Sequence, residues 1–389
     1  MVSENERFPW WQPQMGAEER RLVNEVLEGG FLNDGELTSR FEAQLATALG
    51  VRYVVGVSSG TAALFLSLAS LGVGPGDDVI VPDLTFIATA NAVTLTGATP
   101  ILADVDPRTL TLDPAAVARA ITPRTKAIIP VHVSGRAADM QTILALAQAR
   151  GLRVVEDAAE AFLSKHQGRS LGTWGQLGCF SFSPAKLITM GQGGAVVTND
   201  EALHTRLREL KDQGRPVRGT GGDDLHVSVG FNFKLTNLQA AVGLGQLASI
   251  QERLATMRRT YEAYRDGLKD VRGMGLFGFS LETGESPQWV DAWCDDRDGL
   301  VEYLRARGAE CRKFWFPLHT QAPYRRSDEG FPHSTALASK AFWLPSALSL
   351  SKADVATICG WIREYRPSRV PPHPVGVSMD KSFSSGAHE

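Results

Sequence analysis

The sequence predicts an α/β protein with two parts: a large domain with a mostly parallel mixed sheet sandwiched by helices, and a smaller C-terminal α+β domain. Short apolar runs alternate with helical patterns through the first half of the chain, which is typical of parallel strands covered by helices on both faces. A long helical segment at 235–268 and several shorter elements follow. With 389 residues, 43% of them apolar, the chain is long enough for two hydrophobic cores.

In chain order, two helical patterns at 18–30 and 37–50 form an introductory arm, and glycines stand at their ends, where helix C-caps favour them. The predicted strands that follow are YVVGV (53–57), DVIVP (78–82), TPILADV (99–105), AIIPVHV (127–133), LRVVED (152–157), CFSFS (179–183) and GAVVT (194–198). Residues 235–268 predict one long helix or a kinked pair that bridges the two domains. Beyond it we expect a helix at 297–307, a strand at 311–316 and a helix at 352–365.

This order of elements predicts the boundaries of the domains. The N-terminal arm and the large domain occupy 1–245, and the linking helix and the small C-terminal domain occupy 246–368. The tail at 369–389 is polar, and its composition predicts disorder.

Charge and cysteine content narrow the function classes. The net charge of −3 predicts neither a nucleic-acid partner nor a membrane partner, since such partners are usually met by a strongly basic surface. No long apolar run and no signal-peptide pattern are present, so we expect a cytoplasmic protein. The scattered Cys179, Cys294, Cys311 and Cys359 have no metal-ligand spacing and predict structural thiols and no metal site.

Lys186 lies in CFSFSPAKLITMGQGGAVVTND, between two predicted strands. A turn containing proline and serine precedes it, and a glycine-rich turn follows, where backbone can approach a ligand closely. A partly buried lysine at such a place can attack a carbonyl carbon. The alternative is a structural turn without chemistry.

Two further motifs lie at predicted strand ends. Asp157 ends the strand of LRVVEDAAEAF, at the edge where open α/β sheets bind ligands; the alternative is a helix N-cap. In YVVGVSSGTAALFLSL a strand leads through Ser-Ser-Gly-Thr into a helix, and backbone N–H groups at a helix start can bind phosphate, although any capped strand-to-helix junction looks similar. Dinucleotide-binding and Walker-type glycine motifs are absent.

Together these segments resemble the DegT/StrS-type sugar aminotransferases, which depend on pyridoxal 5'-phosphate (PLP) and have the fold type I, aspartate aminotransferase-like fold. The resemblance runs from Gly16 to Tyr365. It is carried by VPDLTFIATANAV, GATPILADVDP, KAIIPVHVSG, VVEDAAEAF, SFSPAK, GQGGAVVTND and GFNFKLTNLQAAVGLGQL.

The resemblance implies a role for each matching residue. Lys186 would hold PLP as a Schiff base and later transfer protons, and Asp157 would pair with the pyridine nitrogen. Gly60, Thr61 and Ser181 would hold the phosphate. Phe86 would stack on the cofactor, although composition alone favours a buried core phenylalanine.

Four other positions also follow from the resemblance. Asn232 would reach the phosphate of a neighbouring subunit, which implies a homodimer with shared active sites. Glu160 stands where many relatives carry Gln or His against the phenolic oxygen of PLP, and a glutamate donates a hydrogen bond there only when protonated. His319 and Arg312 would contact the substrate; the alternative for His319 is packing between aromatic rings.

The implied reaction is ping-pong transfer of an amino group from an amino acid, L-glutamate, to a keto sugar, with a nucleotide-linked sugar as the expected acceptor. Two rival functions remain. A dehydratase of the same family would carry histidine in place of Lys186, and a non-enzymatic regulator would keep the cofactor pocket without turnover.

Overall fold

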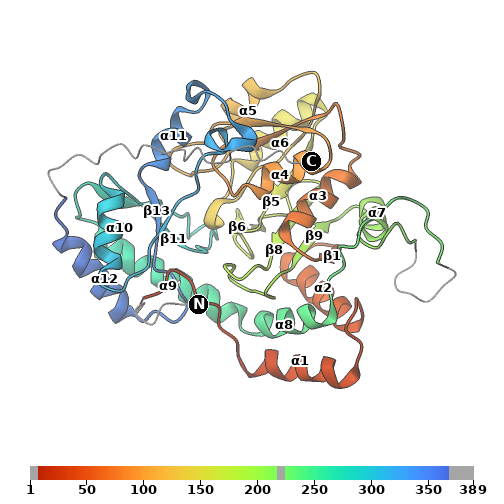
Figure 1. Cartoon of the computed structure of the whole chain (residues 1–389), viewed down its shortest axis with the longest axis horizontal. Coiled ribbons are helices and arrows are strands. Elements are labelled where there is room, and N and C mark those ends of the chain that lie inside the picture. The colour runs from red at the N-terminus through yellow and green to blue at the C-terminus, as the bar shows by residue number, and fades with distance from the viewer. Residues whose placement is uncertain (1–7, 217–223, 368–389) are drawn as a thin grey trace, which may run out of the picture.

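The computed structural model describes residues 8–216 and 224–367, and it confirms the predicted α/β class. A seven-stranded sheet with helices on both faces forms the larger part, and a four-stranded sheet lies beside it (Figure 1). The tail at 369–389, for which we predicted disorder, lies outside the described residues.

The large sheet is mixed but mostly parallel, as predicted. In spatial order its strands are β1 (Tyr53–Val57), β9 (Gly194–Thr198), β8 (Leu177–Ser181), β5 (Arg153–Asp157), β4 (Thr125–Ile128), β2 (Asp78–Pro82) and β3 (Thr99–Ala103). Only β9 is antiparallel to its neighbours, while the remaining pairs are parallel. The carboxyl ends of all strands except β9 therefore meet at one edge of the sheet.

Apolar side chains cover both faces of this sheet, as expected of a buried parallel sheet. Helices α3 (Gly60–Ser70), α4 (Ala88–Leu95) and α7 (Glu201–Lys211) pack on one face. Helices α2 (Glu36–Leu49), α5 (Pro114–Ala120), α6 (Met140–Arg150) and α8 (Asn237–Ala248) pack on the other. The arm helix α1 (Ala17–Gly29) lies along α8 at the bottom of Figure 1.

The segment 235–268 forms the kinked pair rather than one long helix. Helix α8 ends at Ala248, and α9 (Ile250–Leu268) begins after the single residue Ser249. Helix α8 packs on α1 and α2, whereas α9 packs on α12 (Lys352–Glu364). The predicted domain boundary at 245/246 falls inside α8, and the division into domains stays a prediction.

The second sheet is antiparallel, with the order β10 (Met274–Leu276), β11 (Val290–Cys294), β13 (Ala341–Leu344) and β12 (Arg312–Lys313). Helices α10 (Arg297–Arg305) and α12 lie in the same region, and α11 (Pro332–Ala338) precedes β13. The strand predicted at 311–316 is regular only over β12. The chain then turns at Pro317, and the N–H of Leu318 donates to the carbonyl of Asp83 beyond β2 (2.8 Å).

Short elements complete the chain. A two-stranded hairpin joins β6 (Lys165–His166) and β7 (Arg169–Ser170). The 3-10 turns are η1 (Val133–Gly135), η2 (Leu318–Thr320), η3 (Ala322–Tyr324) and η4 (Asp328–Gly330).

Over residues 8–216 and 224–367, no helix is both long enough and apolar enough to cross a membrane. In the same part of the chain, no cluster of three or more His, Cys, Asp or Glu residues could hold a metal ion. The four cysteines are buried and form no disulfide. Burial raises the pKa of the Cys359 thiol to about 11, so this thiol stays protonated near neutral pH.

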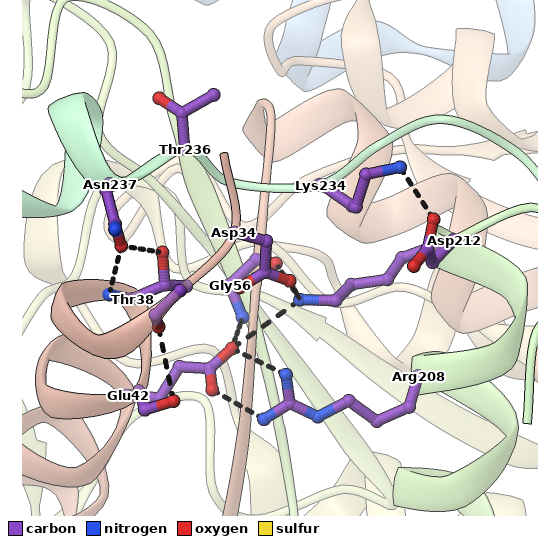
Figure 2. A network of polar contacts seen from close by, with 12 residues as sticks. Asp34, Thr38, Glu42, Gly56, Arg208, Asp212, Lys234, Thr236 and Asn237 are labelled. Carbon is purple, nitrogen blue, oxygen red and sulfur yellow. Dashed lines mark hydrogen bonds and ion pairs between the residues drawn. The ribbon is translucent and has the colours of Figure 1, made fainter. Parts of the chain in front are cut away.

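A buried charge cluster joins α2, β1 and α7 (Figure 2). The Lys211 ammonium lies 3.0 Å from Asp34 and 3.7 Å from Glu42, and it donates to the carbonyl of Gly56 at 3.1 Å. Glu42 also accepts from the Gly56 N–H (2.7 Å) and pairs with Arg208. Burial lowers the pKa of Lys211, and Glu42 opposes that effect. The carboxylates thus balance the buried Lys211 ammonium and the partly exposed Arg208 guanidinium.

The segment after α7 returns to the same place. The Lys234 ammonium pairs with Asp212 at 2.6 Å (Figure 2). The N–H of Ser58 donates to the carbonyl of Phe233 at 2.9 Å. The chain around Phe233 therefore runs along the end of β1, beside the start of α3.

We predict that Glu42→Ala lowers the free energy of unfolding by about 2–3 kcal/mol, because it removes the carboxylate that Lys211 and Arg208 share and leaves Asp34 alone to balance the buried Lys211 ammonium. Urea unfolding measures this change. The control is Glu18→Ala, since Glu18 pairs with Arg21 on an exposed helix face and should leave the unfolding midpoint unchanged. Equal losses in the two variants would contradict the role of the cluster.

Candidate active site

A cavity of about 460 Å³ opens at the edge where the strand carboxyl ends meet. The loops after β1, β2, β5 and β8 contribute to it, together with residues from the arm and the second sheet. The sequence-predicted residues that line it are Gly60, Thr61, Phe86, Asp157, Glu160, Ser181, Lys186 and Arg312. Residues far apart in the sequence therefore share one pocket.

Lys186 lies on the turn that follows β8. Its N–H donates to the carbonyl of Ser183 (3.0 Å), which closes the turn. Its Nζ donates to Oε1 of Glu160 at 3.2 Å and lies 5.0 Å from the ring centre of Trp289. The side chain is 13% exposed, so the amine faces the cavity rather than bulk solvent.

Asp157 is the last residue of β5 and is buried. Its Oδ2 accepts from the hydroxyl of Thr89 at 2.8 Å, and its Oδ1 accepts from the N–H of Ala159 at 3.1 Å. No helix begins directly after Asp157; a turn leads to β6 instead, so the helix N-cap interpretation is wrong. Burial raises the pKa of Asp157, while the bond from Thr89 opposes that effect.

Glu160 is buried next to Lys186. Its second oxygen, Oε2, accepts from the N–H of Ser134 at 3.1 Å. Burial raises the pKa of Glu160, and the charge of Lys186 is the largest effect that opposes it. This carboxyl is therefore easier to protonate than an exposed glutamate.

The turn between β1 and α3 approaches β8 closely. Ser59 caps α3 by accepting from the N–H of Ala62 at 3.1 Å. A Cβ on Gly60 would lie 2.7 Å from the Cβ of Ser181, so the close approach requires glycine. The start of α3, with Thr61 and Ser181 beside it, is suited to bind an anion.

Aromatic rings form another wall of the cavity. Phe86 lines it and is 53% exposed, so it is not the buried core residue that composition alone favours. The Arg312 guanidinium lies 4.7 Å from the ring centre of Trp10 and 5.7 Å from that of Trp343. Arg312 therefore stands at the cavity with its charge against two rings.

Two sequence-predicted residues do not line this cavity. Asn232 is exposed, and its Oδ1 accepts from Lys234 Nζ at 2.8 Å. His319 is fully buried: Asp83 accepts from its backbone N–H at 2.8 Å and contacts its Nδ1 at 2.6 Å. It also stacks on Phe331, with ring centres 4.6 Å apart. This geometry agrees with the alternative in which His319 packs against aromatic rings rather than contacting a substrate.

Sequence reasoning missed several lining residues. Thr89, which orients Asp157, lies one helical turn after Phe86, and that spacing could have indicated it. The tryptophans gave no local signal, because they come from the arm and from around the second sheet. They are Trp10, Trp289, Trp315 and Trp343.

The fold and the lysine-bearing pocket are those of an aminotransferase. A solved structure with this fold is an aminotransferase of Brucella abortus, with TM-score 0.83 and 34% identity over 89% of this chain and 95% of that one. The model of the DegT/DnrJ/EryC1/StrS aminotransferase family matches residues 13–363. The chain belongs to this family.

Two further relatives agree. The GDP-perosamine synthase of Caulobacter vibrioides is 37% identical over 88% of this chain and 94% of that protein. Spr1654 of Streptococcus pneumoniae, solved in its PLP form, has TM-score 0.87 and 25% identity over 92% of this chain and 97% of its own. The comparisons confirm the predicted family and an enzyme of the sugar aminotransferase class.

We predict that Glu160→Gln raises the melting temperature of the cofactor-free protein at about pH 8, by roughly 1–3 °C. Because burial raises the pKa of Glu160, the unfolded chain ionises this carboxyl first. Stability is therefore lost as pH rises from the ordinary glutamate range towards the folded pKa. Glutamine has no such loss, so the gain should vanish at about pH 4.

Calorimetry at both pH values measures this difference. The control is Glu25→Gln, on an exposed face of α1. A lower melting temperature of Glu160→Gln at the higher pH would show that the ion pair with Lys186 outweighs the cost of burial.

Proposed function

We propose that this protein transfers an amino group from L-glutamate to a nucleotide-linked keto sugar, with PLP bound to Lys186. The observation that carries this proposal is the position of the Lys186 amine in a cavity that is also lined by the buried Asp157. The start of α3, with Thr61 and Ser181 beside it, lines the same cavity and is called the anion seat below. The name of the Caulobacter relative, a GDP-perosamine synthase, favours a nucleotide-linked acceptor.

The residues present fit PLP. The amine of Lys186 suits its aldehyde, the start of α3 suits its phosphate, and Asp157 suits its pyridine nitrogen. Because Gly60 has no Cβ, the start of α3 can lie close to Ser181 beside the proposed phosphate position. When bound, the cofactor withdraws electrons from the α-carbon of the substrate amine.

The protein's own groups would supply orientation and proton transfer. Lys186, once displaced, would be an amine held beside the substrate α-carbon, where it would accept a proton and donate one within each half-reaction. Thr89 fixes Asp157. Phe86 would cover one face of the bound ring, and Arg312 would meet an anionic group of a substrate.

Both substrates would use this one cavity in turn, since glutamate leaves as its 2-oxo acid before the keto sugar enters. His319, buried against Asp83, would then affect the sugar site by holding the segment around it. Lys186 argues against the dehydratase, for which we expect histidine at this position.

We further propose a cytoplasmic homodimer with shared active sites. Asn232 is exposed and lies outside the cavity of its own chain, which supports its role at the phosphate of a neighbouring subunit. We also place the boundary between two domains near the helix break at Ser249.

We predict that Lys186→Ala abolishes the near-visible absorption of the purified protein with PLP and lowers kcat by about 10³-fold or more, since it removes the covalent anchor and the base. The wild type should be yellow and bleach on addition of glutamate. Absorption spectra with and without glutamate measure both effects. A wild type that binds no PLP when it is supplied would overturn the proposal.

We predict that Gly60→Ala weakens PLP binding about tenfold or more, because the added methyl group would meet Ser181 and displace the anion seat. Fluorescence titration with PLP measures the affinity. Gly29→Ala is the matched control, since a Cβ there meets nothing within 4 Å. Unchanged affinity in Gly60→Ala would show that phosphate binds elsewhere.

A further inference from the structure

A chain of buried polar contacts runs from the second sheet to Lys186. Arg136 and Asp291 form an ion pair in which both side chains are at most 1% exposed. Asp291 also accepts from the hydroxyl of Ser134 at 2.9 Å. The N–H of Ser134 donates to Glu160 at 3.1 Å, and Glu160 contacts Lys186 at 3.2 Å.

Ser134 links the two parts of this series of contacts: it binds Asp291 through its side chain and Glu160 through its backbone. Its φ of +53° is in the left-handed region, which a non-glycine residue seldom adopts without support. Its hydroxyl binds Asp291, its N–H binds Glu160, and its carbonyl accepts from the N–H of Gln288 at 2.9 Å. Asp291 and Gln288 belong to the region of β11, so the second sheet supports this conformation.

Arg136 ties the turn to that sheet from the other side. Its guanidinium donates to the carbonyls of Gly278 (2.8 Å) and Phe277 (3.1 Å) in addition to Asp291. It also lies 4.0 Å from the ring centre of Phe279. A planar guanidinium with this many fixed partners has little freedom to move, so the η1 turn is anchored to the second sheet.

We propose that Ser134, Arg136 and Asp291 are positioning residues that hold the Glu160 carboxyl against Lys186 from across the interface between the two sheets. The inference rests on the proposed function of Lys186, and it adds that packing of the second sheet determines where Glu160 lies. Asp291 acts through Ser134, and neither residue lines the cavity.

The test uses the reactivity of Lys186 in the cofactor-free protein. Formaldehyde with cyanoborohydride methylates the free amine, and mass spectrometry of the Lys186 peptide gives the rate. The contact with Glu160 at 3.2 Å competes with attack of this amine on the aldehyde. Loss of one contact from the chain of contacts that positions Glu160 should therefore raise the rate about fivefold.

We expect Ser134→Ala, Asp291→Asn and Glu160→Gln each to give this rise. Ser134→Ala added to Glu160→Gln should give no further rise, because Ser134 acts through Glu160. The matched control is Asp104→Asn: Asp104 is a buried carboxylate that accepts from Ser334 without reaching Glu160, and the variant should react at the wild-type rate.

A wild-type rate in Ser134→Ala, or an equal rise from Ser134→Ala with and without Glu160→Gln, would overturn the inference. Ser134→Ala keeps the test valid if Asp291→Asn fails to fold. With PLP bound, Ser134→Ala should also move the pH midpoint of the absorption change in the same direction as Glu160→Gln, and an unmoved midpoint counts against the inference. Failure of the wild type to bind PLP would refute the proposed function alone, since the methylation rates need no cofactor.

Discussion

The common direction of the strands is the constraint on which the site depends. Because β1, β2, β5 and β8 run the same way, the residues that follow them meet at one edge, although more than a hundred residues separate β1 from β8 along the chain. The reversed strand β9 starts at this edge, where a Cβ on Gly194 would lie 2.4 Å from the carbonyl oxygen of Ser59. The backbone of β9 at Gly194 thus packs directly against the turn at Ser59 and Gly60, where the proposed anion site begins.

Strand alternation then separates the functions of neighbouring carboxylates. Asp157 faces the cavity, whereas Glu156 faces the opposite side of β5 and accepts from the N–H groups of Gly172 and Gly175. Glu156 also contacts Nε2 of His132, whose Nδ1 accepts from the N–H of Ala138. Glu156 is therefore the acceptor of several donors and fixes the turn that leads into β8, the strand that brings Lys186 to the site.

The site residues that lie next to strands of the large sheet were predictable from the sequence, whereas those contributed by the second sheet were not. Lys186, Asp157 and Gly60 each lie within a few residues of a strand whose apolar pattern is clear, so strand direction alone brings them together. His319 looked functional from its neighbours in the chain, but its partner Asp83 lies 236 residues away. Likewise, the patterns of one helix and of a kinked pair are the same over 235–268, and packing on two different surfaces decides between them.

The tryptophans that line the cavity show why the contribution of the second sheet has no local sequence pattern. Trp289 precedes β11 and Trp343 lies in β13, so both line the cavity of Lys186 only if the second sheet keeps its position beside the first. A buried ion pair tolerates little displacement, because separated charges would lack both water and each other. The pair of Arg136 with Asp291 therefore holds β11 against the η1 turn. Since the same pair reaches Glu160 through Ser134, a shift of the second sheet would move the aromatic wall and the carboxyl beside the lysine together.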